Sequence, residues 1–347
     1  MVLSTPEYSK SQVNKAGEIL TKEDPSMSEW LWSYGVVENW RSSHAHPINT
    51  FQATLRNRLK TVDKDALVVQ RLKRMPSMIS QLRRFKSMKL ARMQDIGGLR
   101  AVVSDLGKVR ELEKKYRKSR FKHGLVSTKD YISHPKESGY RSIHLVYKYQ
   151  NNKVPEYNGL HIELQIRSKL QHYWATAVET MGTFLEYALK SSEGPQEWLN
   201  FFSLAGCAFA CWEDTPIAPV YKGKSKEEIY AEMLNEAERL CIYDRLEAFS
   251  IAAKQVRIEK KKGSYHLIIL NLDQKGVWVQ TYPRRCLAAA NKEYAKHEKR
   301  ISMGENIQVV LVSANSIGDL RRAYPNYFLD TRKFIHQLKR MDKWSKK

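Results

Sequence analysis

Two acidic residues in this chain, Asp95 and Glu163, stand in informative local patterns, and the neighbours of Asp95 suit a carboxylate that binds a divalent metal beside phosphate groups. Asp95 stands just before Gly97 and Gly98, which allow a tight turn into the apolar run that follows, so Asp95 is expected at the edge of a strand. Glu163 lies in residues 160–167, where polar and apolar residues alternate and the polar ones share one face. Carboxylate oxygens are ligands that Mg²⁺ takes beside substrate phosphates. A capping Asp in a helix-to-strand turn and a solvated strand face are the alternative interpretations.

A cluster of cations precedes Asp95. It begins at Arg71 and Lys73 and continues through Arg84 to Arg92. Residues 66–85 have a helical pattern, in which cations three or four residues apart project from one face and can surround a triphosphate, with Arg binding oxygens in pairs. A solvated basic helix face is the alternative.

Residues 130–144 combine a polar loop with a strand. Proline, serine and glycine predict a loop that carries Lys136, and the two-residue period of the following strand places Tyr140 and His144 on one face. A tyrosine beside a lysine and a histidine offers stacking for a base and polar groups for its sugar and phosphates. The alternative is a polar loop before an ordinary half-exposed strand.

The elements that must position these residues change in character along the chain. Residues 1 to about 65 have helical patterns, residues 66 to about 190 mix helices with short strands, and a break rich in Pro, Gly and Lys at 215–224 predicts a linker. The elements beyond it can form a small sheet domain on their own. The predicted helices are 9–20, 29–41, 50–60, 66–85, 109–116, 198–211, 226–256, 285–299 and 330–341, and the predicted strands are 98–103, 141–149, 160–165, 265–272, 277–281 and 307–312.

Composition limits the class of protein and its partners. At 347 residues the chain suits one to three domains, and its longest apolar stretches, such as residues 201–210, are shorter than the roughly 18 to 20 residues of a membrane span. We therefore expect a cytoplasmic protein. Its four cysteines show no C-x-x-C spacing, which predicts unpaired thiols. The net charge of +22 indicates a polyanionic partner.

Taken together, the chemical segments resemble the synthetase domain of the RelA/SpoT family over about residues 66–190. The family's patterns occur in order: Arg-x-Lys at Arg71, Asp-Ile-x-Gly-x-Arg at Asp95, Asp-Tyr-Ile-x-x-Pro-Lys-x-x-Gly-Tyr-x-Ser-x-His at Asp130, and Glu-x-Gln-Ile-Arg at Glu163. The resemblance implies transfer of a pyrophosphoryl group from ATP to a hydroxyl of a nucleotide or an RNA end.

The resemblance also implies roles for single residues. Asp95 and Glu163 would bind Mg²⁺, and Glu163 would help to deprotonate the acceptor hydroxyl. The ATP phosphates would be held by Arg71 and Lys73, with Arg84 and Arg100. On the acceptor side, Lys136 and His144 would face phosphate or ribose, Tyr140 would stack on the base, and Gln165, Arg167 and His172 would complete the site.

Two residues depart from the family's pattern. Gln81 stands where many relatives have a lysine in the helix, and Ser138 replaces the usual Asn before Gly139. The first puts one phosphate contact in doubt, and the second can reflect a changed acceptor. The His-Asp pair of the family's hydrolase domain does not occur in the sequence, so we expect synthesis without degradation.

Near the end of the chain, Tyr324 and Tyr327 form a Tyr-x-x-Tyr element. It resembles the element by which the fused toxin–antitoxin subgroup of toxic small synthetases, called CapRel, covers its own ATP site. Two aromatic residues packing a turn are the alternative. In that subgroup the C-terminal domain is a pseudo zinc finger that senses a phage structural protein, such as the major capsid protein, and the released enzyme modifies the 3′ CCA end of tRNA.

These observations predict an α+β fold, with a RelA/SpoT-like mixed sheet flanked by helices and a small C-terminal α/β domain. The predicted domains are an N-terminal helical segment at 1–65, a synthetase domain with a helical extension at 66–214, and a regulatory domain at 215–347. The predicted function is an autoinhibited tRNA pyrophosphokinase that blocks translation during phage infection. The alternatives are a small alarmone synthetase that makes (p)ppGpp from GDP or GTP, and a catalytically dead RNA-binding or sensor protein.

Overall fold

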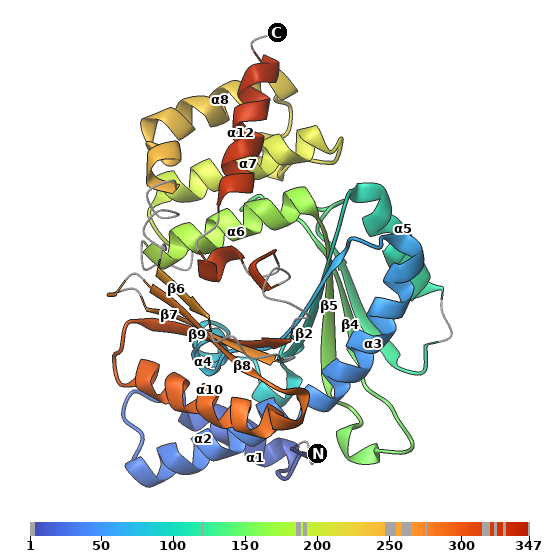
Figure 1. The fold of residues 1–347 in the computed structure, drawn as a ribbon, viewed down its shortest axis with the longest axis vertical. Coiled ribbons are helices and arrows are strands. Elements are labelled where there is room, and N and C mark those ends of the chain that lie inside the picture. Colours follow the sequence, from blue (N-terminus) through green and yellow to red (C-terminus); the bar gives the residue numbers. More distant parts are fainter. Residues whose placement is uncertain are drawn as a thin grey trace.

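The fold is built on a mixed sheet that runs through most of the molecule (Figure 1). The computed structural model describes residues 4–118, 121–184, 189, 193–246, 255–258, 265–271, 273–274, 276–313, 320–322, 325–328 and 331–345. Over these residues the strand order is β3-β4-β5-β2-β1-β9-β7-β8-β6. Neighbouring strands are antiparallel except for the parallel pairs β2/β5 and β6/β8. The strands are β1 Leu67–Leu72, β2 Gly97–Val103, β3 Gly124–Asp130, β4 Ile143–Lys148, β5 His161–Ser168, β6 Gln255–Ile258, β7 Tyr265–Asn271, β8 Gly276–Tyr282 and β9 Ile307–Ser313.

Helices flank the sheet, which confirms the predicted α+β class. Helices α6, α7, α8 and α12 gather at the end where the chain terminates, whereas α1 and α2 lie at the opposite end beside α10 (Figure 1). The helices are α1 Lys10–Ile19, α2 Met27–Ser42, α3 Ala45–Val62, α4 Met75–Arg84, α5 Leu106–Arg117, α6 Lys169–Phe184, α7 Gln196–Trp212, α8 Lys226–Arg239, α10 Leu287–Ser302 and α12 Arg332–Ser345. No helix in the described residues is long and apolar enough to cross a membrane.

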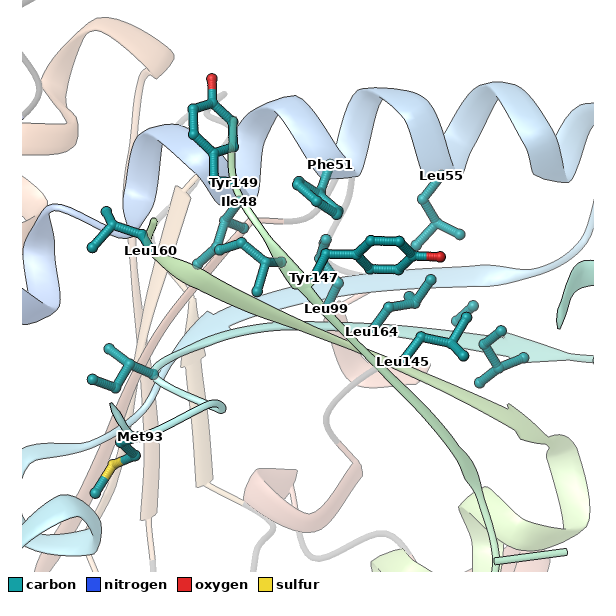
Figure 2. Packing of buried hydrophobic residues seen from close by; sticks show 14 of the residues in the cluster. Ile48, Phe51, Leu55, Met93, Leu99, Leu145, Tyr147, Tyr149, Leu160 and Leu164 are labelled. Carbon is teal, nitrogen blue, oxygen red and sulfur yellow. The ribbon is translucent and has the colours of Figure 1, made fainter. Parts of the chain in front are cut away.

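Helix α3 packs on the strands that carry the predicted chemistry (Figure 2). Its residues Ile48, Phe51 and Leu55 are three and four positions apart, so they lie on one side of the helix and are fully buried. Figure 2 shows them directed at side chains of three strands, namely Leu99 of β2, Leu145 and Tyr147 of β4, and Leu164 of β5. The apolar residues of these strands face α3, so the polar residues that alternate with them along each strand lie on the opposite face of the sheet.

The predicted helix over residues 66–85 is wrong in its first half, which forms strand β1. The β-branched pair Val68 and Val69 favours a strand, and β1 pairs along its whole length with β2. Helix α4 starts only after Arg74, with Pro76 in its first turn. Arg71 and Lys73 therefore do not share a helix face with Arg84.

Two further differences are local. Strand β3 was not predicted, because residues 124–130 are largely polar and exposed at the edge of the sheet. The helix predicted over residues 226–256 is interrupted by a turn after Arg239, residues 242–246 are helical again, and residues 255–258 form strand β6. The four cysteines are unpaired, as predicted.

The C-terminal strands continue the sheet of the N-terminal half and do not form a separate one. Strand β9 is antiparallel to β1, and Arg71 faces Val312 in this pairing. Without β9, strand β1 would leave backbone donors and acceptors unpaired at an edge. The regulatory region predicted at 215–347 is thus joined by strand pairing to a strand that carries a predicted ATP-binding residue.

Candidate active site

The two predicted metal carboxylates come from adjacent parallel strands, with Glu163 on β5 and Asp95 just before the start of β2. Strands β2 and β5 pair with Gly98, three residues after Asp95, opposite Glu163. Lys73 forms an ion pair with Asp95, and its backbone N–H donates to the carbonyl of Ile96 at 2.8 Å. The positive charge of Lys73 also favours the ionised form of Glu163. Lys73 therefore lies close to both carboxylates.

Glu163 belongs to a closed ring of five hydrogen-bonded side chains. Its Oε1 lies 2.8 Å from His144 Nδ1, and His144 Nε2 lies 2.7 Å from the hydroxyl of Tyr140. Arg167 Nη2 donates to that hydroxyl at 2.8 Å and to Gln165 Oε1 at 3.0 Å. The Gln165 amide then donates to Glu163 Oε2 at 2.8 Å, which closes the ring. Five residues that were predicted for the site are thus assembled into one network.

The ionisation of this network follows from burial and pairing. Burial alone would raise the pKa of Glu163, but the hydrogen bond and charge of His144 outweigh it and lower the pKa to about 2. Burial opposes a charge on His144, but Tyr140 and Glu163 raise its pKa above the usual value. Glu163 is therefore a carboxylate at neutral pH, and His144 favours the protonated form that pairs with it.

Two further predicted residues, Arg100 and His172, lie with Arg167 where β2, β5 and α6 meet. Arg100 of β2 is the partner of Gln165 in the sheet register. Burial first, and then the charges of Arg100 and Arg167, lower the pKa of His172 to about 3, so His172 is neutral at physiological pH. Arg167 is fully buried, and within the described part of the chain its Nε and Nη1 have no hydrogen-bond partner. Buried donors of this kind suit an anionic ligand.

Of the remaining predicted residues, Lys136 and Arg84 lie outside the ring of five. Lys136 is exposed, and its Nζ stands 4.7 Å from the centre of the Tyr131 ring and 5.5 Å from that of Tyr140. Arg84, at the end of α4, forms an ion pair with Glu193 and is not joined to the ring of five. Tyr324 lies outside the described residues, and of Tyr327 only the backbone is described, in the short helix η6 Pro325–Phe328.

Two residues of the site were not identified from the sequence. Tyr131 is half-buried, and its ring contacts Tyr140 and His144 edge-on with centroids 5.8 and 5.2 Å apart. It stands inside the Asp-Tyr-Ile motif, which was a usable signal. Glu213 pairs with Arg141 directly beside Tyr140, but it is 72 residues away along the chain and no local pattern marks it.

The carboxylates suit a Mg²⁺ that arrives with a nucleotide. Mg²⁺ commonly binds through one or two carboxylates together with substrate phosphates, and Asp95 and Glu163 supply two. No group of three or more His, Cys, Asp or Glu side chains that could hold a metal ion occurs among the described residues. In the structure, the ammonium of Lys73 supplies the positive charge beside Asp95.

The residues of this site fall within one segment that matches a protein family. Residues 70–184 match the family described as "Region found in RelA / SpoT proteins". This segment of the chain is therefore similar to that region. It covers the end of β1 and the whole of β2, β3, β4 and β5, and it includes the whole ring of five.

Particular relatives are similar over the same part of the chain. GTP pyrophosphokinase YjbM of Bacillus subtilis is 37% identical over 112 residues, which are 31% of this chain and 52% of that protein. GTP pyrophosphokinase YwaC of Bacillus subtilis is 33% identical over 87 residues, 24% of this chain and 40% of that protein. The chain thus spans about half or less of the curated relatives it matches. The structure of small alarmone synthetase 1 from Bacillus subtilis with its product pppGpp covers 53% of this chain and 94% of its own, at 24% identity and a TM-score of 0.44.

The ring of five predicts how Tyr140 variants behave. Tyr140 is only 5% exposed and its hydroxyl has two partners, so Tyr140→Phe leaves a buried nitrogen of His144 unpaired. Such a loss is worth about 1 to 3 kcal/mol, and we expect turnover to fall roughly 5- to 100-fold, with a larger fall for Tyr140→Ala. Steady-state rates against acceptor concentration measure this, and Tyr8→Phe, outside the site, serves as the matched control. A rate for Tyr140→Phe within about twofold of wild type would show that the aromatic ring of Tyr140, and not its hydroxyl, is the important part of the side chain.

Proposed function

We propose that this chain transfers a pyrophosphoryl group from ATP to a hydroxyl of a nucleotide or an RNA end. The observation that carries the proposal is the convergence of Lys73, Asp95 and the Glu163 network within the segment that matches RelA/SpoT proteins. Phosphoryl-type transfer needs positioning, cations and a metal more than covalent chemistry, and the site offers these.

Each group of side chains has a part in this proposal. Asp95 and Glu163 hold a Mg²⁺ that, when bound, neutralises the donor phosphates. Arg71 and Lys73 bind those phosphates, and Arg167 presents free donors to an anion on the other side. Because the pKa of Glu163 is lowered to about 2, this carboxylate is a weak proton acceptor in the free protein. Its negative charge is therefore more useful for binding the metal than for deprotonating the hydroxyl.

Two acceptors remain candidates, each favoured by a different observation. The curated relatives carry the name GTP pyrophosphokinase, which favours GDP or GTP and synthesis of (p)ppGpp. The net charge of +22 favours a longer polyanion, the 3′ CCA end of tRNA. The second acceptor would make the chain a toxin that blocks translation.

Label transfer from γ-labelled ATP in the presence of Mg²⁺ decides between them. The acceptors to compare are GDP, GTP, intact tRNA and tRNA from which the terminal CCA has been removed. We expect one class to be labelled. Label in the guanine nucleotides identifies a (p)ppGpp synthetase, and label in tRNA that disappears with the CCA end identifies a tRNA pyrophosphokinase. No label in any acceptor contradicts the proposed activity.

We also propose that the C-terminal region restrains this activity. It reaches the site at three places. Strand β9 pairs with β1 at Arg71, and the carbonyl of Arg322 lies 3.2 Å from Nε2 of His172. Residues 320–322 and 325–328, drawn in red, lie between α6 and the sheet (Figure 1), and η6 contacts both α6 and β7.

The third contact is made by Glu298 of α10 at the start of α4. Its Oε1 accepts the backbone N–H of Met75 at 2.9 Å and the hydroxyl of Tyr294 at 2.6 Å, and its Oε2 lies 3.5 Å from Nη2 of the buried Arg41. The first N–H groups of a helix favour anions, including phosphate. Helix α4 begins two residues after Lys73, so Glu298 places a carboxylate beside the proposed phosphate site.

In this proposal the resting chain is held closed by its own C-terminal region, and Tyr324 and Tyr327 belong to the restraining segment. A trigger that prefers the open form would shift the population by its differential affinity. A phage structural protein such as the major capsid protein is the proposed trigger, which would make the chain part of antiviral defence.

A further inference from the structure

The loop that carries Lys136 is closed by only two hydrogen bonds of its own. The N–H of Gly139 donates to the carbonyl of Lys136 at 2.9 Å, and the N–H of Lys136 donates to the carbonyl of Tyr140 at 3.3 Å. Gly139 has a φ of +79°, which residues with a side chain rarely adopt. We call residues 136–140 the acceptor loop. Lys136 and Glu137 are exposed, so contacts with other parts of the protein must hold the acceptor loop in position.

Helix α7 contacts the acceptor loop backbone to backbone. A Cβ added to Gly206 of α7 would lie 2.6 Å from both the Cα and the carbonyl oxygen of Gly139. A Cβ added to Gly139 would lie 2.9 Å from the carbonyl oxygen of Ser203 and 3.0 Å from the Cα of Gly206. The two backbones can approach this closely only because both positions are glycine. The hydroxyl of Ser203 also donates to the carbonyl of Glu137, so α7 fastens the loop at two points.

The end of α7 fastens the residue that follows the loop. Arg141 Nη1 donates to Glu213 Oε2 at 2.7 Å and to Thr215 Oγ1 at 3.0 Å. The side chains of Arg141 and Glu213 are 3% and 7% exposed. Glu213 also accepts hydrogen bonds from Ser168, at the end of β5, and from Gln171, in the first turn of α6. A buried ion pair thus links α7 to both strands of the ring of five.

We propose that α7 sets the position of the acceptor loop relative to Glu163, with Gly206 and Glu213 as positioning residues and Ser203 in support. This inference rests on the proposed function and deepens it, because it assigns acceptor positioning to a helix outside the matched segment 70–184. None of these three residues needs to touch the acceptor. They act through Lys136 and Tyr140, whose placement against Glu163 decides whether the acceptor hydroxyl reaches the donor phosphate.

The decisive variant is Gly206→Ala in the full chain. Alanine is the better helix former by about 1 kcal/mol, so the change does not weaken α7 itself and acts only by pushing Gly139 away. We expect the KM for the acceptor to rise, or kcat/KM for it to fall, by about 10- to 100-fold, with the KM for ATP within about twofold of wild type. Gly35→Ala in α2 is the matched control, because an added Cβ there meets nothing within 4 Å.

Milder variants keep the test informative if Gly206→Ala folds poorly in thermal melts. Ser203→Ala removes only the hydrogen bond to Glu137, and we expect an acceptor-specific loss of about 2- to 10-fold. Glu213→Gln keeps the shape of the side chain and removes its charge, and we expect a larger acceptor-specific loss. Equal losses toward ATP and acceptor in all three variants, or unchanged acceptor kinetics, overturn the positioning role.

Hydrogen exchange separates this inference from the proposed function. We expect the amides of Lys136 and Gly139 to exchange faster in Gly206→Ala than in Gly35→Ala, whichever acceptor is used. If wild type transfers no label, the proposed function fails, whereas faster exchange still supports the α7 contact. If wild type is active and both exchange and acceptor kinetics are unchanged in Gly206→Ala, the inference alone fails.

Discussion

Glu163→Gln and Asp95→Asn are each expected to lower label transfer by about 10³-fold or more without unfolding the protein. Each substitution keeps the shape of the side chain and removes one of the two negative charges proposed to hold Mg²⁺. At about 1.4 kcal/mol for each factor of ten, the loss corresponds to roughly 4 kcal/mol of transition-state stabilisation. Transfer is measured from γ-labelled ATP at saturating Mg²⁺, with a thermal melt of each variant.

The Glu163 variant also has a stability signature with a defined sign. Because folding lowers the pKa of Glu163 to about 2, its contribution to stability is present above the unfolded pKa, near 4.5, and is lost as the pH falls toward 2. Glu163→Gln should therefore be less stable than wild type at pH 7, and the difference should shrink in acid. Glu111→Gln on α5, which removes a surface carboxylate paired with Lys108 and Lys115, should change neither rate nor stability appreciably. Near-wild-type transfer by Glu163→Gln or Asp95→Asn would disprove the assigned metal site.

Glu298→Ala should make the enzyme more active at low ATP although it makes the protein less stable. Glu298 is buried and holds the N-terminus of α4, Tyr294 and Arg41 together, so its loss should release α10 from the proposed donor site. Breaking a buried ionic contact costs about 3 to 5 kcal/mol, although Glu38 still pairs with Arg41. We expect the KM for ATP to fall about tenfold, which corresponds to a coupling of about 1.4 kcal/mol.

Glu293→Ala is the matched control on the same helix, because in the described part of the chain Glu293 pairs with Lys296 and His297 of its own helix α10. It should leave the KM for ATP unchanged. Partial unfolding cannot mimic the expected result, since unfolding lowers activity. An unchanged or higher KM for ATP in Glu298→Ala contradicts restraint by α10, and equal activation by Glu293→Ala shows that the contact with α4 is not its cause.

Local patterns in the sequence predicted the class of fold, which the structure confirms, and grouped several of the candidate site residues. Alternation along residues 160–167 placed Glu163, Gln165 and Arg167 on one face, and the structure joins all three in the ring of five. The same two-residue period placed Tyr140 and His144 together, and they are hydrogen-bonded. Such patterns are readable because a strand's geometry repeats locally, whatever the rest of the chain does.

Local patterns did not decide the environment of strand β1 or of its cations. Residues 66–85 have helical spacing, yet residues 67–72 pair with β2 and reach β9, because partners distant in sequence outweigh weak local preferences. Arg84 consequently lies away from the ring, whereas Arg71 lies at the junction with the C-terminal strands. A helical pattern in one segment contains no information about which strand will lie next to it.

The residues that surround and support the site were not identifiable from local sequence patterns, because they reach it through contacts between distant parts of the chain. The contacts of Gly206 with Gly139, of Glu213 with Arg141 and of Glu298 with Met75 join residues 67, 72 and 223 positions apart. In the sequence, Gly206 is one small residue in an apolar helix, and Glu213 and Glu298 resemble surface acids. Their importance comes from burial against groups that need a partner, and burial is a property of the packed chain. The sequence therefore indicated which residues are candidates for the chemistry, and the packing of the chain shows which others hold them in place.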